Sequence, residues 1–481
     1  MNLKAPPGVF DILPYDNKEP WKSSYLWSEV EAILRKMALN YGFKELRTPT
    51  FEDTKLFIKG VGEGTDIVGK EMYTFIDKGE RSLTLRPEGT AAVVRAFIEN
   101  RLDQTPYQKY FYIGSFFRYE RMQAGRYREF HQFGIEAYGN PSPEQDIEII
   151  DLAYSICQKL EIKGLKVLLN SIGSSETRAK FREALITYLN KFKDSLSEDS
   201  KVRLEKNPLR VLDSKDEKDQ AALKDAPSIL DYLTDDDKAH FEKVKAGLTA
   251  LAIPFEITSR LVRGLDYYNK TVFEIISGDL GSQNSLGGGG RYDGLVKSIG
   301  GPDVASTGYA MGIERLLQIM VKQAVPFNYI PGPLFYLVPI DDAAKQFSIK
   351  LAHDLRQEGI AVEVDLLDRK VGKAISRAVS LNATYAAVIG ENELKSQVLE
   401  LKNLGTQEKT QLPFSSLLRV LKLESEGTAL LERYAALNEP FVNEAEKKFF
   451  VDKINNQISS VKAITTKLED ALKQFQNSLK P

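Results

Sequence analysis

The sequence predicts an α+β protein of several domains, and three stretches of the chain carry the prediction. Residues 111–139 read as strand, basic loop, strand, which is the pattern of an antiparallel hairpin. Residues 172–250 are charged and mostly helical in pattern, as expected of a helical insertion. Residues 333–424 alternate between short apolar runs and amphipathic segments, which is typical of a small α/β domain.

The composition predicts a globular chain without a membrane span or a secretion signal. At ~150 residues per domain, 481 residues make two to four domains. Hydrophobic residues make up 42% and charged residues 27%, which is ordinary for a globular protein. No apolar run approaches the ~18 residues that a membrane span needs, and the N-terminus lacks an apolar signal core. The single Cys157 excludes an internal disulfide framework and a multi-cysteine zinc site, and it fits the reducing cytoplasm.

The histidine count and the net charge limit the kinds of ligand to be expected. The chain has three histidines, His131, His240 and His353, so a histidine-based metal centre is not expected. The net charge is −2. A nucleic-acid partner would therefore have to bind to local basic patches, because no global positive field attracts it.

The segments around the hairpin are expected to form further helices and strands. Residues 21–40 have helical periodicity. The next segment is extended with Pro49 inside the strand, which suits a sheet edge because proline removes a hydrogen-bond donor. Residues 82–86 are predicted to be a strand, followed by a helix that Thr90 could cap. Residues 143–161 are predicted to form a helix.

The hairpin is predicted to present a polar face to a ligand. Its first arm runs from Phe111 to Arg118 and its second arm from Phe130 to Tyr138. Because strand side chains alternate faces, Arg118 and Glu120 share a face of the first arm. On the second arm, one face carries Gln132, Gly134 and Glu136, and the opposite face carries Phe133, Ile135 and Ala137. The loop between the arms adds Arg121, Arg126 and Arg128. A purely structural hairpin has little use for such a face.

Two motifs combine a carboxylate with cations or phenols, and each has a plain structural interpretation beside the functional one. Glu88 in RPEGT could present a carboxylate to a ligand ammonium, or it could be the acidic first turn of a helix. The stretch RGLDYY, from Arg263 to Tyr268, could line a site, or it could be a surface turn in which Asp266 neutralises Arg263. The spacing alone does not decide between these interpretations.

Two glycine-rich stretches also admit both interpretations. The run from Gly287 to Gly290 is expected to be a loop, either simply flexible or bringing backbone close to a ligand. Arg315 follows glycines near the start of a predicted helix, where it could bind a polyphosphate or be an ordinary solvated arginine. Taken together, the four motifs and the hairpin predict a site for an anionic, nitrogen-rich ligand.

The order of these motifs resembles that of class II aminoacyl-tRNA synthetases. Pro49 in GFKELRTPTFE, FRYER with its basic loop, and GIERLL with Arg315 resemble motifs 1, 2 and 3 of that class. LRPEGT, GRYREFHQFGIE, LVRGLDYYN and LGGGGRYDGL are together similar to histidyl-tRNA synthetases, over roughly residues 1–425. The resemblance implies a catalytic domain with an antiparallel sheet and flanking helices. It also implies an ATP-dependent ligase that joins L-histidine to the 3′ end of tRNA-His.

The resemblance implies a role for each candidate side chain that faces ATP. Arg118 would hold the α-phosphate, with Glu120 near the adenine, and Arg315 would bind the γ-phosphate. Arg263 would lie beside the α-phosphate, so Arg118 and Arg263 are the implied catalytic residues. ATP would arrive with Mg²⁺, and no protein histidine or cysteine would hold a metal.

The resemblance also implies the contacts to the other two substrates. The ammonium end of histidine would be bound by Glu88, Thr90 and Gln132, and the imidazole pocket would be lined by Glu136, Tyr267 and Tyr268. The tRNA acceptor end would meet Gln123, Arg126 and Arg128. A homodimer in the cytoplasm, with its interface at the motif 1 region, is expected.

The resemblance divides the chain into five segments. The catalytic domain would comprise residues 1–171 and 251–328, interrupted by a helical insertion over 172–250. Residues 333–424 would bind the anticodon. The tail, 426–481, exceeds the usual bacterial pattern of the family and is predicted to be a helical extension, whose apolar residues from Val451 follow a 3-4 repeat. That repeat fits a coiled-coil-like seam that mediates association, or an amphipathic helix packed on the chain's own body.

Three alternative functions share parts of this pattern. The first is a synthetase-like regulatory subunit of ATP phosphoribosyltransferase, which lacks an anticodon domain. The second is a class II synthetase for glycine, proline or threonine, against which RGLDYY and FHQFGIE argue. The third is a synthetase-derived sensor of uncharged tRNA. The arginines Arg118, Arg263 and Arg315 argue against the first and third.

Overall fold

The computed structural model describes residues 3–120, 125–278, 285–327, 332–367, 369–418 and 420–421. The chain divides into two units, residues 1–329 and 330–481, and each is described by itself. Gln123 and the whole tail segment 426–481, with its predicted seam, lie outside the described residues.

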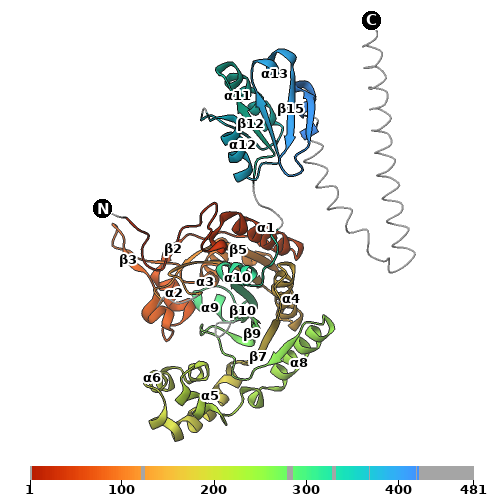
Figure 1. The fold of residues 1–481 in the computed structure, drawn as a ribbon. Helices are drawn as coiled ribbons and strands as arrows, with labels where there is room; N and C mark the ends of the chain where they lie inside the picture. The colour runs from red at the N-terminus through yellow and green to blue at the C-terminus, as the bar shows by residue number, and fades with distance from the viewer. Residues whose placement is uncertain are drawn as a thin grey trace, which may run out of the picture. The chain divides into compact units, whose positions relative to one another are not determined.

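An eight-stranded sheet organises the first unit, in the order β1-β5-β6-β11-β10-β9-β7-β8 (Figure 1). Neighbouring strands from β5 to β7 in this order run antiparallel, and the two edge strands, β1 and β8, pair in parallel. The strands are β1 (Lys44–Glu45), β5 (Gln108–Phe117), β6 (Glu129–Tyr138), β7 (Leu165–Ser171), β8 (Phe255–Ile257), β9 (Asn269–Ser277), β10 (Ser285–Arg291) and β11 (Ser306–Gly312). A small sheet beside it has the order β2-β4-β3, with β2 (Phe51–Asp53), β3 (Thr74–Ile76) and β4 (Ser82–Leu85).

Helices cover both faces of the large sheet, which separates two apolar cores. The helices of the first unit are α1 (Ser24–Asn40), α2 (Thr54–Val61), α3 (Thr90–Glu99), α4 (Pro143–Lys159), α5 (Ser175–Leu189), α6 (Glu198–Lys206), α7 (Glu217–Leu223), α8 (Asp235–Ala250), α9 (Leu295–Ile299) and α10 (Ile313–Lys322). Short helical turns are η1 (Pro20–Lys22), η2 (Ile67–Glu71), η3 (Leu102–Gln104), η4 (Asn190–Ser195), η5 (Pro208–Asp213) and η6 (Ile229–Tyr232). On one face, α1, α4, α8 and α10 bury their apolar sides against the sheet. On the other face, α3 and α5 contribute to a second core. The predicted α+β class is confirmed.

The predicted hairpin is β5 and β6, and its alternation of faces is confirmed. Gly114 pairs with Gln132 and Tyr110 pairs with Glu136 in the antiparallel register. Phe133 and Ile135 point into the core under α1 and α10. The neighbouring residues, including Gln132, therefore face the opposite side of the sheet.

The glycine run is a central strand, so the expectation of a loop is wrong. Gly287 to Gly290 lie in β10, between β9 and β11. Glycine is ordinarily unfavourable in a strand, but here neighbouring groups occupy the space that side chains would need. A Cβ atom on Gly289 would lie 2.1 Å from the carbonyl oxygen of Gly308. Close contacts across the sheet, which the sequence cannot display, therefore decide the structure of this run.

Two smaller expectations are also wrong. Pro49 lies between β1 and β2 rather than inside a strand. Thr90 is the first residue of α3, and the cap is provided by Glu88, whose carboxylate accepts hydrogen bonds from the backbone N–H groups of Thr90 (2.8 Å) and Ala91 (2.7 Å). A carboxylate suits this position because the helix N-terminus carries a partial positive charge.

The insertion over residues 172–250 is helical, as expected, and it is joined to the sheet by its last helix. Phe241, Val244 and Leu248 of α8 are buried in the same core as α4. Residues 1–329 form one compact unit that includes these helices. The exact boundaries of the insertion stay a prediction.

The second unit contains a five-stranded mixed sheet in the order β13-β12-β14-β15-β16. Its elements are β12 (Phe335–Pro339), α11 (Asp342–Gln357), β13 (Val362–Val364), α12 (Val371–Ser380), β14 (Tyr385–Ile389), α13 (Glu391–Ser396), β15 (Val398–Asn403) and β16 (Lys409–Pro413). Alternate residues of β12 pack on α11 and on α12, which cover opposite faces. The predicted α/β pattern is confirmed.

A buried ionic cluster ties α4, α8 and the end of β10 together. Arg291 is 0% exposed, and its Nη2 atom lies 2.7 Å from Oδ1 of Asp146. The other carboxylate oxygen of Asp146 is 2.7 Å from Nε2 of His240. The guanidinium also donates to the backbone carbonyls of Asn140 and Ser142, and to Oδ1 of Asp293 at 3.2 Å. All the charged groups of the cluster are thus paired, as burial requires.

We predict that Asp146→Ala lowers the free energy of unfolding by about 3–5 kcal/mol, because it removes the buried carboxylate that contacts both Arg291 and His240 and leaves Arg291 with Asp293 as its carboxylate partner. Denaturant titration of both proteins measures the difference. Asp303→Ala is the control, since its partner Lys297 lies 2.9 Å away in an exposed pair and the expected cost is below about 1 kcal/mol. Equal losses in the two variants would contradict the prediction.

Candidate active site

A cavity of about 530 Å³ opens on the face of the large sheet opposite α1 and α10. Its walls come from the turn before α3, the β5–β6 hairpin, the loop before β9, strand β10 and the start of α10. It brings together these predicted residues: Glu88, Thr90, Arg118, Glu120, Arg126, Gln132, Arg263, Tyr267, Tyr268 and Arg315. Stretches separated by more than 200 residues in the chain therefore meet at one site.

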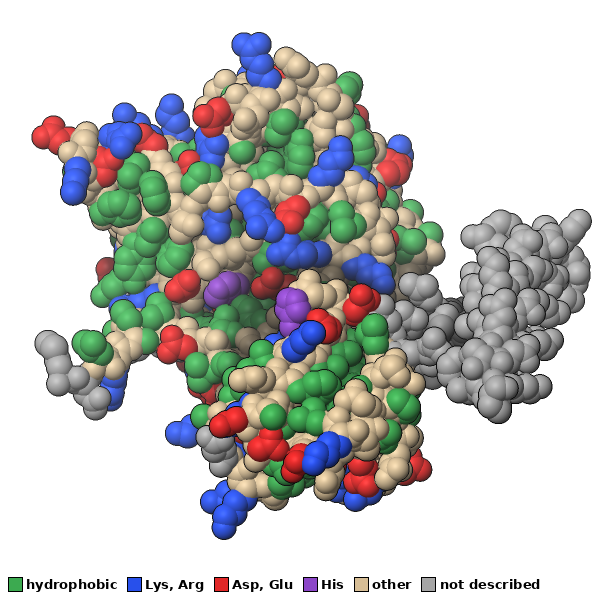
Figure 2. Space-filling view, turned by 90° about the horizontal axis from the view of Figure 1, so that it is seen from above, with side chains coloured by type: hydrophobic (Ala, Val, Ile, Leu, Met, Phe, Trp, Pro, Cys, Tyr) green, Lys and Arg blue, Asp and Glu red, His purple; other side chains and the backbone are tan. Residues whose placement is uncertain are grey.

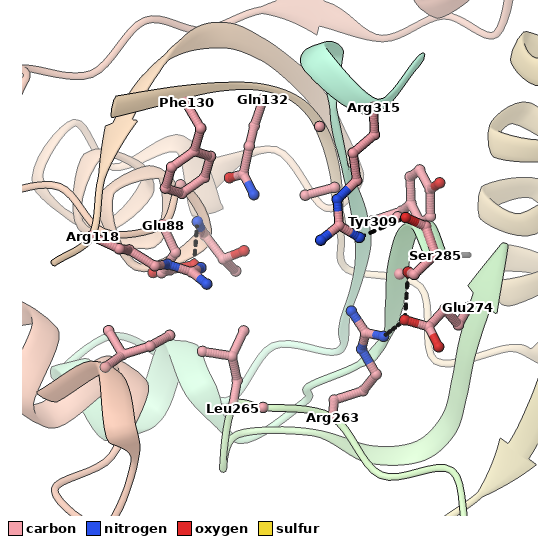
Figure 3. Close-up of a pocket in the computed structure, with 18 of the residues that line it drawn as sticks. Glu88, Arg118, Phe130, Gln132, Arg263, Leu265, Glu274, Ser285, Tyr309 and Arg315 are labelled. Carbon is pink, nitrogen blue, oxygen red and sulfur yellow. Dashed lines mark hydrogen bonds and ion pairs between the residues drawn. The ribbon is translucent and has the colours of Figure 1, made fainter. Parts of the chain in front are cut away.

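Three arginines point into the cavity from different elements (Figure 3). Arg118 donates from Nε to the carbonyl oxygen of Pro87 at 2.8 Å, and its guanidinium lies against the Phe130 ring. Arg263 and Arg315 lie together on the other side (Figure 3). Burial lowers the pKa of Arg315, and the neighbouring Arg126 and Arg263 cations lower it further. An anion bound between these guanidinium groups would relieve their mutual repulsion.

Glu274 and Ser285 connect Arg263 to Arg315. Arg263 donates from Nη1 to Oε1 of Glu274 at 2.8 Å. The same oxygen accepts the Ser285 hydroxyl, and the Ser285 carbonyl oxygen accepts Nη1 of Arg315 at 2.6 Å. Figure 3 shows this series of contacts along one wall. Strands β9 and β10 therefore orient both arginines.

The glycine strand provides the surface on which Arg263 lies. A Cβ atom on Gly288 would lie 2.3 Å from Cζ of Arg263. No real Cβ atom approaches a guanidinium so closely, so only glycine leaves room at this position. The group that lies against Gly288 is thus a side chain of the same protein, and the expected close approach of these glycines to a ligand stays a prediction.

The other end of the cavity is formed by carboxylates and phenols. Glu88 lies at the N-terminus of α3, and Thr90 donates its hydroxyl to Oε1 of Glu136 at 2.8 Å. The hydroxyl of Tyr292 donates to the other oxygen of Glu136. The rings of Tyr267 and Tyr268 are 4.7 Å apart, and each also contacts the Tyr292 ring.

Burial controls the protonation of this end. Glu136 is 1% exposed, and burial raises its pKa to about 8. Burial also raises the pKa of Glu88, and it raises that of Tyr268 to about 12. In the described part of the chain no donor reaches the buried Oε1 atom of Gln132. A buried polar atom of this kind favours a ligand that can supply the missing hydrogen bond.

Some predicted residues lie elsewhere. Glu136 lies behind the wall, held by Thr90 and Tyr292, and is not itself part of the cavity lining. Arg128 stacks on the Tyr119 ring, 4.1 Å from its centre, and its side chain packs against Gly8. Arg126, in contrast, lines the cavity and forms an ion pair with Glu120 at 3.2 Å.

The sequence interpretation missed several residues of the cavity. Tyr112 fills the space between Gly89 and Gly134, where Cβ atoms would lie 2.3 and 2.1 Å from its ring. Glu274 and Tyr292 were not singled out, although Tyr292 follows the glycine run directly. The helical insertion, where no site was expected, contributes Arg210, Asp213 and Lys215 to the lining. An insertion of ordinary charged helices offers no signal for such a role.

The described residues contain no group of three or more His, Cys, Asp or Glu side chains placed to hold a metal ion. None of the helices in that part of the chain is long and apolar enough to cross a membrane. On the face shown in Figure 2, lysine and arginine side chains are interspersed with aspartate and glutamate. This mixture accords with the net charge of −2.

Family models match most of the chain. A model described as histidyl-tRNA synthetase matches residues 19–316, and a model described as an anticodon binding domain matches residues 335–424. A histidine–tRNA ligase from Protochlamydia amoebophila is 53% identical over 423 residues, which cover 88% of this chain and 100% of the relative. A histidine–tRNA ligase from a Geobacillus strain is 47% identical over 426 residues, covering 88% and 99%.

Solved structures agree with the sequence matches. The apo histidyl-tRNA synthetase of S. aureus is 36% identical, with a TM-score of 0.74, over 88% of this chain and 100% of that one. A Bacillus halodurans protein described as an ATP phosphoribosyltransferase regulatory subunit/histidyl-tRNA synthetase is 21% identical, with a TM-score of 0.58, over 81% and 98%. At that identity the second likeness shows the fold alone.

We predict that Glu136 makes stability depend on pH. Its folded-state pKa of about 8 lies above its ordinary value of 4.5, so the folded protein keeps a proton that the unfolded chain releases. Its contribution to stability therefore falls as pH rises from about 4.5 to about 8, by up to about 1.4 kcal/mol per pH unit. Glu136→Gln should flatten this slope in denaturant titrations between pH 5 and 8.

Glu99→Gln is the control, because Glu99 is exposed on α3 and its substitution should leave the slope unchanged. If Glu136→Gln keeps the wild-type slope, Glu136 is already ionised in this range.

Proposed function

The chain belongs to the histidyl-tRNA synthetase family and is a histidine–tRNA ligase, and from this premise we propose the role of each side chain in the cavity. The enzyme activates L-histidine with ATP to give histidyl-adenylate and pyrophosphate, and then transfers histidine to the 3′ end of tRNA-His. The observation that carries the assignment of roles is the convergence of Arg118, Arg263 and Arg315 on one cavity whose other end holds Glu88, Gln132 and the tyrosines.

Arg118 and Arg263 would act on the α-phosphate of ATP, and Arg315 on the γ-phosphate. The carboxylate oxygen of histidine attacks the α-phosphorus, and the bond from that phosphorus to the pyrophosphate oxygen breaks. Charge then spreads over the phosphate oxygens, where fixed guanidinium groups stabilise it. Glu274 and Ser285 hold two of these guanidinium groups before the substrate arrives, so little reorganisation is needed. Glu120 would lie near the adenine.

Histidine would bind at the other end of the cavity. Glu88, Thr90 and the unsatisfied Gln132 would hold its ammonium group, and Tyr267 and Tyr268 would line the imidazole pocket with Glu136 behind them. Pairing both ring nitrogens with polar partners gives selectivity, because an analogue that lacks one nitrogen leaves a buried group unpaired. Such discrimination reaches ~10⁴-fold.

The hairpin loop would approach the tRNA acceptor end. The terminal 3′-hydroxyl attacks the carbonyl carbon of the adenylate, and AMP leaves. Gln123, Arg126 and Arg128 would contact the tRNA, while residues 333–424 would bind the anticodon, as the anticodon-domain match supports. This contact should weaken as salt rises, because it neutralises phosphates.

We propose that Mg²⁺ enters as part of the ATP complex and helps to neutralise the departing pyrophosphate. No resident metal site needs to be assigned, since the cavity arginines supply fixed positive charge beside the phosphates. We also propose a cytoplasmic location, where ATP and tRNA are available and where the buried thiol of Cys157 stays reduced.

The relatives help to separate the alternative functions. Eight relatives, 45–53% identical, are all described as histidine–tRNA ligases. The regulatory-subunit alternative is disfavoured by the match to an anticodon binding domain over residues 335–424. The sensor alternative is disfavoured by the three arginines in the cavity.

We propose that the enzyme is a homodimer whose interface includes the small sheet near motif 1. Phe51 and Phe75 lie on the same face of the small sheet, with their rings 6.2 Å apart, and Ile76 lies next to Phe75 on the opposite face. Their exposed fractions are 50%, 43% and 64%. Neighbouring exposed apolar side chains of this size often mark a protein interface.

The first test is pyrophosphate exchange with each of the twenty amino acids. Exchange should occur with histidine, and no exchange with histidine would overturn the assignment. Arg263→His should lower kcat/KM for exchange by about 10²–10³, because it removes a fixed charge from the developing phosphate charge. Arg182→His, at an exposed position on α5, is the matched control and should keep wild-type exchange. Near-normal exchange in Arg263→His would refute its role.

A second prediction concerns the glycine strand. Gly288→Ala should lower exchange at least tenfold, because the added methyl group displaces the Arg263 guanidinium. Gly294→Ala is the matched control, since nothing lies within 4 Å of a Cβ atom at that position. Steady-state exchange kinetics and a thermal melt of each variant measure the effects. If both variants retain wild-type activity, Arg263 does not depend on this contact.

The dimer is tested by Ile76→Asp, which places a charge in the proposed interface. We expect the variant to sediment as a monomer, or to dissociate at least tenfold more readily, in analytical ultracentrifugation. Val202→Asp, at an exposed apolar position of the insertion, should leave assembly unchanged. A monomeric wild-type protein, or an unaffected Ile76→Asp dimer, would count against the proposed interface.

A further inference from the structure

The loop that carries Arg263, Tyr267 and Tyr268 is held by side chains and carbonyls of the helical insertion. It runs from residue 258 to residue 268, between β8 and β9, without regular secondary structure. Asp266 lies near its end, three residues after Arg263 and directly before Tyr267. Its Oδ1 atom accepts a hydrogen bond from Nδ2 of Asn207 at 2.9 Å, and Nε of Arg210 is 3.9 Å away.

Two further contacts join the loop to the insertion. Arg178 on α5 donates from Nη1 to the carbonyl oxygen of Tyr268 at 3.1 Å. In the opposite direction, Arg260 donates from Nη2 to the carbonyl oxygens of Leu223 (2.6 Å) and Lys224 (2.9 Å) at the end of α7. The loop is therefore bound to the insertion at three residues: Arg260 near its start, and Asp266 and Tyr268 near its end. Figure 1 shows α5 and α6 together at the bottom of the first unit.

The turn after α2 contacts Asp266 from the side opposite the insertion. The backbone N–H of Asp266 donates to the carbonyl oxygen of Val61 at 3.4 Å. A Cβ atom on Gly62, whose φ is +103°, would lie 2.8 Å from Oδ2 of Asp266. Asp266 is thus held between the turn after α2 and the insertion, and a movement of the insertion would act on this carboxylate directly.

We propose that Asn207, Arg210 and Arg178 of the insertion are positioning residues for histidine activation, and that they act through Asp266 and the loop backbone on Arg263 and the two tyrosines. The inference rests on the roles proposed above for those three side chains. It assigns the insertion a part in the first half-reaction, before any tRNA is bound. The alternative interpretation of RGLDYY, in which Asp266 neutralises Arg263, is wrong. Arg263 pairs with Glu274, and Asp266 accepts a hydrogen bond from Asn207.

In the roles proposed above the loop would contact both histidine and the α-phosphate, whereas Arg118 and Arg315 belong to other elements. Loosening the loop should therefore raise KM for histidine and lower kcat, with a smaller change in KM for ATP. Partial unfolding of the insertion would act differently. It would reduce the active fraction, which lowers kcat and leaves both KM values unchanged.

The experiment measures histidine-dependent pyrophosphate exchange by the full chain without tRNA. Asn207→Ala should lower kcat/KM for histidine about tenfold and raise KM for histidine at least threefold. Asn207→Asp should lower kcat/KM about a hundredfold, because it opposes two carboxylates. Combining Asn207→Asp with Asp266→Asn exchanges donor and acceptor, and should restore kcat/KM to within about threefold of the wild-type value.

Tyr188→Phe is the matched control. It removes a hydrogen bond from Tyr188 to the carbonyl oxygen of Ala222 inside the insertion and leaves the loop untouched, so its KM for histidine should stay within twofold of wild type. The proposal is overturned if Asn207→Ala stays within twofold of wild type, if the exchanged pair recovers nothing, or if kcat alone falls. Absence of exchange in the wild-type chain would instead overturn the proposed function, and this inference with it.

Discussion

The site depends on glycines in the large sheet, which have no side chains and so leave space on the face that forms the cavity. Three glycines of the large sheet each lie where a Cβ atom would collide with a side chain that forms or supports the cavity. The collisions would be with Tyr112 at Gly134, Arg263 at Gly288 and Glu136 at Gly308, at 2.0 to 2.3 Å. Charged and phenolic groups can therefore lie flat against the strands. A sheet with ordinary alternating side chains would fill this volume and leave no cavity.

The site also depends on how its charges are distributed. The arginines gather where phosphates would bind, and the buried carboxylates Glu88 and Glu136 gather where an ammonium group and an imidazole would bind. Desolvation raises the pKa of both carboxylates, while it lowers that of Arg315. The arginine end is therefore less favourable when empty than when it holds an anion. With the roles proposed above, this arrangement would favour the two substrates of the first half-reaction over unrelated ligands.

The helical insertion is part of the same arrangement. Its last helix shares the core of the sheet, and its other helices reach the loop that follows β8. The cluster of Arg291, Asp146 and His240 ties that last helix to the strand that ends beside Tyr292. The insertion is thus connected to the cavity in two places. One is the buried cluster of Arg291, Asp146 and His240, and the other is the loop that follows β8. A module that reads as plain charged helices in the sequence has a structural reason to affect catalysis.

Local patterns in the sequence predicted the hairpin, the α/β domain and the charged residues that meet in the cavity. The period-2 alternation of residues 130–138 determines which face holds Gln132, because strand geometry leaves no other choice. The resemblance to a known family then related those residues to substrates. Other features could not be read from the chain, because they depend on contacts between distant segments. The glycine run became a strand through its neighbours β9 and β11, and Glu88 rather than Thr90 capped its helix. Only the tertiary structure placed Glu274 against Arg263 and Asn207 against Asp266, since no periodicity records a contact across 59 residues.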